Sequence, residues 1–157
     1  IVIKEGGYNE YFVKSQDNEL YLRLSGRYLM SGLDEFLIKL RINPDSLTYS
    51  DDLQLKMGLA SLICYYRRKN GLKDFTKSKR DEWDLFLREL EQWIDRRNIR
   101  RKREAKKRFT LSKVLLKQKA FLEYFAMLAS CFESDPLFFL YEDVNLDIPG
   151  DLKQFLV

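Results

Sequence analysis

The 157-residue chain contains no histidine and has only two cysteines, three prolines and seven glycines. Without histidine it cannot form the usual Ser–His or Cys–His catalytic pairs or mixed Cys/His zinc sites. So few glycines and prolines leave little material for the tight turns of an all-β fold. The longest apolar stretches, such as 137–141, are far shorter than the roughly 20 residues that span a bilayer. We therefore predict that the protein is not an enzyme, holds no cofactor or metal and has no membrane partner.

The N-terminal residues and the two cysteines both favour a cytoplasmic location. The N-terminal residues 1–5 have neither the basic start nor the long apolar centre of a signal peptide. Cys64 and Cys131 lie far apart and form no C-x-x-C pair, so we interpret both as small buried hydrophobic residues. We expect a cytoplasmic protein.

Apolar residues make up 45% of the chain and aromatic residues 14%, which is enough to build one core. Their spacing favours an all-α fold, a compact helical bundle of about five to six helices in a single domain, 1–157. Residues 1–17 read as an irregular N-terminal segment, and 96–108 as a basic segment between core helices.

Several helices can be placed by periodicity and by capping signals. One begins near Asn18, and a further start is expected at Ser31, three residues before Asp34. Asp51 and Asp52 suit the first turn of another helix, which Asn70 or Gly71 ends in the left-handed conformation. A later helix is expected to start near Thr110 or Ser112 and to run through residue 128. Between these two helices lies the clearest stripe of apolar residues at helical spacing. The stripe consists of Trp83, Phe86, Leu87, Leu90, Trp93 and Ile94.

Residues 96–108 concentrate the positive charge. Nine of these thirteen residues are Lys or Arg and one is acidic, a local net charge of +8. The whole chain carries +4, so the other 144 residues sum to −4. We predict that the segment binds the phosphate backbone of a nucleic acid. The predicted contacts are Arg96, Arg97, Arg100, Arg101, Lys102, Arg103, Lys106, Lys107 and Arg108.

The physical chemistry of the segment favours phosphate groups as its ligand. Like charges one helical turn apart cost roughly 0.2–0.5 kcal/mol per pair, so solubility alone is a poor reason for them. Phosphate contacts release condensed counterions, which drives binding. Arginine outnumbers lysine six to three in the segment, and the guanidinium fork matches phosphate oxygens.

Other interpretations of the segment stay open. It could be a solvated helix extension, a targeting signal, or the basic helix of a protein–protein adaptor that docks an acidic partner. Insertion into an anionic membrane is disfavoured, because Ile99 and Ala105 are its only apolar residues. Smaller basic groups would extend the patch if they are contiguous with it: Arg67, Arg68, Lys69, Lys73, Lys113 and Lys117.

Two other groups are weaker candidates. Trp83 and Trp93 could stack on bases, but their helical spacing favours burial in the core. The acidic residues after position 132 show no calcium-loop pattern, so we interpret them as a solvated or partner-facing surface rather than a metal site.

The combination of a short helical chain, no active site and the stretch Arg96 to Arg108 resembles the small subunit of type I CRISPR effector complexes of the Cascade type. In some of these systems, including I-D, the small subunit is translated separately from the end of the large-subunit gene. The resemblance implies a role in antiviral defence: a non-catalytic subunit that holds DNA or RNA, as a single strand or a guide–target hybrid. It also implies partners among other protein subunits, further copies of this chain included, with sequence specificity supplied by the guide RNA.

Overall fold

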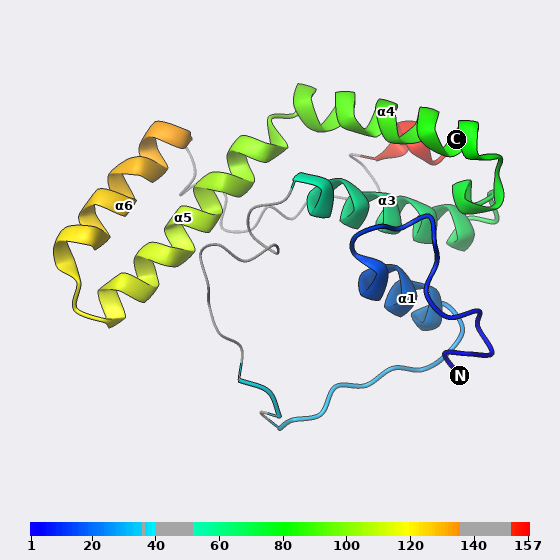
Figure 1. The fold of residues 1–157 in the computed structure, drawn as a ribbon, viewed down its shortest axis with the longest axis horizontal. Helices are drawn as coiled ribbons and strands as arrows, with labels where there is room; N and C mark the ends of the chain where they lie inside the picture. Colours follow the sequence, from blue (N-terminus) through cyan, green and yellow to red (C-terminus); the bar gives the residue numbers. More distant parts are fainter. Residues whose placement is uncertain (36, 40–51, 136–151) are drawn as a thin grey trace. The chain divides into compact units, whose positions relative to one another are not determined.

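The computed structural model describes residues 1–35, 37–39, 52–135 and 152–157. The predicted all-α fold is confirmed: this part of the chain is 66% helical, contains five α-helices and has no strand. They are α1 (Gln16–Ser25), α3 (Asp52–Lys69), α4 (Arg80–Arg96), α5 (Ile99–Lys117) and α6 (Phe121–Ser134). Two short 3-10 helices, η1 (Phe75–Lys77) and η3 (Lys153–Phe155), accompany them (Figure 1). None of the helices in the described ranges is long and apolar enough to cross a membrane.

The contacts divide the chain into two compact units, Ile1–Glu91 with Asp147–Val157, and Gln92–Leu146. We call them the N-terminal unit and the α5–α6 unit. The prediction of one domain, 1–157, stays a prediction.

Aromatic packing builds the core of the N-terminal unit. Trp83 is fully buried, with the ring of Phe12 at 5.2 Å and that of Phe86 at 5.4 Å. Phe75 of η1 stacks on Phe86 at 4.1 Å, and Phe155 of η3 meets the same ring edge-on at 5.8 Å. Within the N-terminal unit the stripe predicted along α4 is therefore a core face, and Leu90 is buried too. The last members of the stripe, Trp93 and Ile94, are also buried and belong to the α5–α6 unit.

The end of α3 follows the prediction from Gly71. That residue has φ +72°, and the amide of Leu72 donates to the carbonyl oxygen of Arg67 at 2.8 Å. The Gly71 amide donates to Arg68 at 3.1 Å, which completes a Schellman closure.

Two predicted helix starts are wrong. Residues 31–35 and 37–39 are not helical, because α1 ends at Ser25 and the apolar residues beyond it do not pack: the exposed fraction of Leu33 is 74%. The remainder of that predicted helix lies outside the described residues. The helix expected to start near Thr110 or Ser112 begins at Ile99, and a turn at residues 118–120 separates it from α6.

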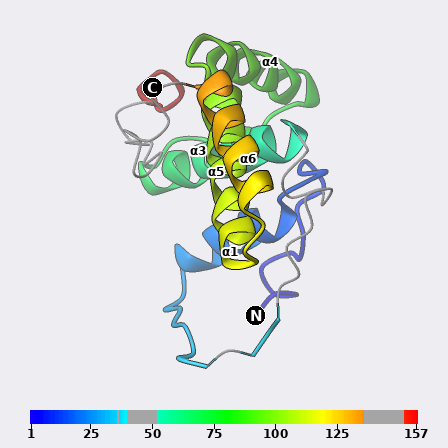
Figure 2. The same ribbon diagram turned by 90° about the vertical axis from the view of Figure 1, so that its left-hand side faces the viewer.

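α5 and α6 lie side by side and run in opposite directions (Figures 1 and 2). The seam between them contains Ala105 and Cys131, both fully buried, with Phe109 and Leu128 packed against them. Small residues at the centre of the seam let the two helices approach closely. The predicted burial of both cysteines is confirmed, since Cys64 is also fully buried.

Candidate functional site

The basic segment 96–108 is not a separate element between core helices. Arg96 is the last residue of α4, Asn98 adopts a left-handed conformation with φ +53°, and residues 99–108 form the first half of α5. Arginines therefore occupy the first turns of α5, where no acidic residue balances the positive end of the helix dipole. This arrangement costs helix stability and would favour a bound anion.

Several of the nine predicted contacts already have acceptors within the α5–α6 unit. Arg100 forms an ion pair with Asp95, and Arg101 donates to the carbonyl oxygen of Ser134. Arg108 donates from Nε to Glu104 at 3.0 Å and from Nη1 to the carbonyl oxygen of Ser130 at 3.1 Å.

Two of these arginines stabilise the antiparallel pair of α5 and α6, which we call the hairpin. Ser134 is the last residue of α6, so its carbonyl oxygen has no partner within the helix. Ser130 lies one turn earlier, and its carbonyl oxygen also accepts from the Ser134 hydroxyl at 2.9 Å. Arg101 supplies a donor to the Ser134 carbonyl and Arg108 a further, charged donor to the Ser130 carbonyl. Both place positive charge at the negative end of the α6 dipole. They hold one edge of the pair of helices together.

Lysines follow another face of α5. Lys102, Lys106, Lys113 and Lys117 fall within about 60° around the axis, since successive residues are about 100° apart. The last three are exposed, and Lys113 places Nζ 4.3 Å above the ring of Phe109. We call these four residues the lysine row. It joins two of the predicted contacts to the predicted extension at Lys113 and Lys117.

The other predicted contacts stand at the edges of this surface. Arg96 and Arg97 are exposed, and the guanidinium of Arg97 lies 5.8 Å from the ring of Trp93. Arg103 and Lys107 are half-buried, and Lys107 lies 3.8 Å from Glu104.

α6 exposes an apolar face that the sequence did not reveal. Two large apolar side chains of α6 are open to solvent: 84% of Leu122 and 62% of Phe125 are exposed. Phe121 and Phe132 are exposed by 56% and 46%. These three phenylalanines fall within about 40° around the axis, and we call them the phenylalanine row. The missed signal is that α6 has more apolar residues than one seam with α5 can cover.

The other predicted extension belongs to the N-terminal unit. Arg67 donates to the carbonyl oxygens of Lys73 at 2.8 Å and Phe155 at 2.7 Å, and its guanidinium lies 4.3 Å from the Phe75 ring. Arg68 is an ion-pair partner inside the same unit, so both arginines have structural roles there.

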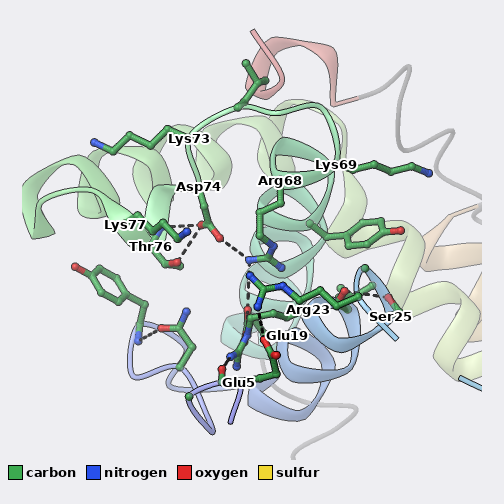
Figure 3. A pocket seen from close by; sticks show the side chains of 18 of the residues that line it. Glu5, Glu19, Arg23, Ser25, Arg68, Lys69, Lys73, Asp74, Thr76 and Lys77 are labelled. Carbon is green, nitrogen blue, oxygen red and sulfur yellow. Dashed lines mark hydrogen bonds and ion pairs between the residues drawn. The ribbon is translucent and has the colours of Figure 1, made fainter. Parts of the chain in front are cut away.

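A polar cluster links α1 and α3 in that unit. Glu19 is fully buried between two guanidinium groups, Arg23 at 3.1 Å and Arg68 at 3.4 Å (Figure 3). Arg68 also meets Asp74 at 2.5 Å, and Arg23 donates to the carbonyl oxygens of the N-terminal segment at Glu5 and Gly7. The cluster ties residues 5–7, α1, α3 and the loop before η1 together.

Charge and burial set the protonation of this cluster. Burial by itself would raise the pKa of Asp74, but the Thr76 amide at 2.9 Å and the Arg68 charge outweigh it and lower the pKa. Burial and then the Asp74 carboxylate raise the pKa of the Cys64 thiol well above its ordinary value. The carboxylate is therefore held ionised and the thiol neutral.

A hollow of about 1150 Å³ lies over the cluster, lined by six Lys or Arg and four acidic residues. Its acidic groups at Glu5, Glu19 and Asp74 are paired with arginines. Lys69 and Lys73 extend away from the cluster in opposite directions (Figure 3). The charges thus pair with each other rather than converge on one point, and the cluster fastens the unit.

Comparison of the chain with models of protein families, with curated proteins and with solved structures found no match. In the described ranges no three His, Cys, Asp or Glu residues gather as a metal would require. The charged and aromatic surface of the α5–α6 unit is the candidate functional site.

Proposed function

We propose that the protein is a non-catalytic subunit that binds the phosphate backbone of a nucleic acid through the basic segment 96–108 and the lysine row. The observation behind the proposal is the charge distribution. A segment of net charge +8 stands in a chain whose other residues are net negative, and it begins α5 at the end of the helix where cations are least favourable.

The contacts divide by role. Arg101 and Arg108 hold the end of α6, so we assign them to structure first. The lysine row has the better geometry for a phosphate backbone. Its four side chains are spread from Lys102 to Lys117 of α5, fifteen helical steps or about 22 Å at 1.5 Å per step. That length accommodates several successive phosphates of one strand.

A role in an RNA-guided CRISPR complex of the Cascade type is the biological setting that the layout resemblance suggests. In that setting base pairing with the guide supplies specificity, and contacts by this protein need not read bases. The competing candidate is an adaptor whose basic helix docks an acidic protein.

Salt dependence of binding tests the proposal. Fluorescence anisotropy with a labelled single strand of about 15 nucleotides should give log K falling against log salt with a slope near −3, from about −0.7 for each of four phosphates. Replacing Lys102, Lys106 and Lys113 with Gln should flatten that slope by about 2 and weaken all sequences alike.

A matched control removes the same charge elsewhere. The triple variant of Lys4, Lys77 and Lys79 to Gln changes three exposed lysines of the N-terminal unit. It should keep the wild-type slope, because those residues lie outside the proposed surface. Equal losses in both variants would mean that net charge alone drives binding, and absence of any nucleic-acid binding would favour the adaptor.

A further inference from the structure

We infer that the α5–α6 unit is a platform for single-stranded nucleic acid, with the phenylalanine row stacking unpaired bases while the lysine row holds their phosphates. This rests on the proposed function and adds to it the class of ligand and a second set of residues. The two rows belong to different helices, and the seam between α5 and α6 sets how they lie relative to each other.

The seam between the helices has two distinguishable edges. One edge is marked by Arg101 and Arg108, which reach across to Ser134 and Ser130. Successive residues are about 100° apart around the α5 axis. The side chains that follow the arginines around this axis are therefore first the buried Ala105 and then Phe109. Phe109 therefore marks the opposite edge.

The same order holds on α6. In the same direction round α6 from Ser130 and Ser134, buried Cys131 lies about 100° from Ser130, and Leu128 about 60° beyond Cys131. Phe109 and Leu128 pack against the same buried pair, so they face each other across the second edge.

Both rows begin just beyond this second edge. On α5 the lysine row follows Phe109, within about 20–80° of it around the axis. On α6 the phenylalanine row follows Leu128, within about 20–60°. The rows therefore open onto one face of the hairpin, lysines on one helix and aromatic rings on the other. The contact of Lys113 with the Phe109 ring at 4.3 Å lies at the border between them.

The dimensions suit a single strand. Packed helices lie about 8–10 Å apart, which is of the order of a nucleotide from its phosphate to the outer edge of its base. A strand that runs along α5 can thus place its bases over Phe121, Phe125 and Phe132. Aromatic rings stack on any base, so such a platform binds without reading sequence.

A duplex and a membrane both fit this face less well. In a duplex the faces of the bases are covered by their neighbours, and the phenylalanine row would have nothing to stack on. An amphipathic helix that lies in an anionic membrane is rich in lysine and arginine itself. α6 has neither residue and carries Glu123 and Glu133.

The test compares strands of equal phosphate number. Anisotropy is measured for the full-length protein with a 15-nucleotide thymidine strand, an abasic strand of the same length and a duplex of that length. We expect the thymidine strand to bind about tenfold more tightly than the abasic strand, because only it offers rings for stacking. Equal affinity for the thymidine and abasic strands would overturn the inference.

Replacing Phe121 and Phe125 together with Leu keeps the apolar surface and removes the rings. Both side chains are more than half exposed, so the variant should fold, which the helical circular dichroism signal checks. It should bind the thymidine strand about tenfold more weakly and the abasic strand as the wild type does. The control Tyr21→Leu removes a ring that is also 56% exposed but lies on α1, and it should change neither affinity.

The outcomes separate this inference from the proposed function. If the lysine variant weakens binding and the phenylalanine variant does not, the phosphate contacts stand and the stacking platform is wrong. If the wild type binds neither strand nor duplex, both are wrong. If it instead sediments with phosphatidylserine vesicles and the phenylalanine variant does not, the face is a membrane surface and the inference is wrong.

Discussion

Arg108 donates a hydrogen bond of 3.1 Å from its guanidinium to the backbone carbonyl oxygen of Ser130, and so joins the most basic stretch of the chain to the end of α6. The predicted contacts in 96–108 therefore do not form one uniform charged surface. Some of their charges hold the fold, and these can be separated from the others by experiment.

The first prediction concerns this contact. Arg108→Ala should lower the free energy of unfolding by about 1–2 kcal/mol, because it leaves a carbonyl at the end of α6 without its charged donor. Urea denaturation followed by circular dichroism measures the change. Arg96→Ala is the control, since Arg96 is exposed at the end of α4 and its loss should change stability by less than about 0.5 kcal/mol. Equal stability of Arg108→Ala and the wild type would contradict the structural role.

The second prediction concerns the buried carboxylate. Glu19→Ala should destabilise the N-terminal unit by about 3 kcal/mol, because Arg23 and Arg68 keep their partly buried charges and lose the carboxylate between them. Asp17→Ala, on the exposed side of the same helix, is the control and should cost much less. Urea midpoints compared at one pH give the result, and a Glu19→Ala midpoint like that of the control would refute the prediction.

The sequence was sufficient for the fold class and for the strongest helix. The α4 stripe repeats apolar residues at three- and four-residue spacing on a single face, and burial of Trp83, Phe86 and Leu90 follows directly from that spacing. Gly71 likewise predicts the end of α3, because glycine adopts the left-handed conformation that closes a helix more readily than other residues.

The breaks around α5 could not be predicted in the same way. Residues 97–120 contain neither glycine nor proline. The chain turns at Asn98 and Lys119, which adopt φ of +53° and +61° although they have side chains. Asparagine adopts this conformation more often than most residues, but lysine does not, so local propensity does not mark the turn at Lys119.

Only part of the candidate site could be predicted from the sequence, because tertiary contacts decide the rest. Charge density predicts the segment 96–108, but only the pairing of α5 with α6 shows that Arg101 and Arg108 face an edge of the seam. The same pairing leaves Phe121 and Phe125 exposed. The cluster around Glu19 joins α1 to α3 across 49 residues, and no local pattern reports that contact.

The third prediction is a pH dependence centred on Asp74. Its pKa in the folded protein is lower than in the unfolded chain, so the ionised carboxylate stabilises the fold at neutral pH. That contribution is lost as the pH falls below about 4, through the lowered pKa. Asp74→Asn should therefore reduce stability at pH 7 and lose less than the wild type on acidification. Urea midpoints of both proteins between pH 7 and pH 3 test this, and a constant difference over that range would count against it.

The last prediction uses the turn between α5 and α6. Lys119 adopts φ +61°, a conformation in which an L side chain crowds the backbone at a cost of about 1–2 kcal/mol. Lys119→Gly should remove that cost, offset by the greater freedom of glycine in the unfolded chain, for a net gain of about 0.5–1 kcal/mol. Lys117→Gly removes the same charge two residues earlier, but at a helical position it should destabilise by up to about 1 kcal/mol. Thermal unfolding of the two variants should thus shift the midpoint in opposite directions from the wild type. If both variants lower the midpoint, relieving strain at Lys119 does not stabilise the protein. The left-handed turn is then held by contacts of the lysine side chain that glycine cannot make.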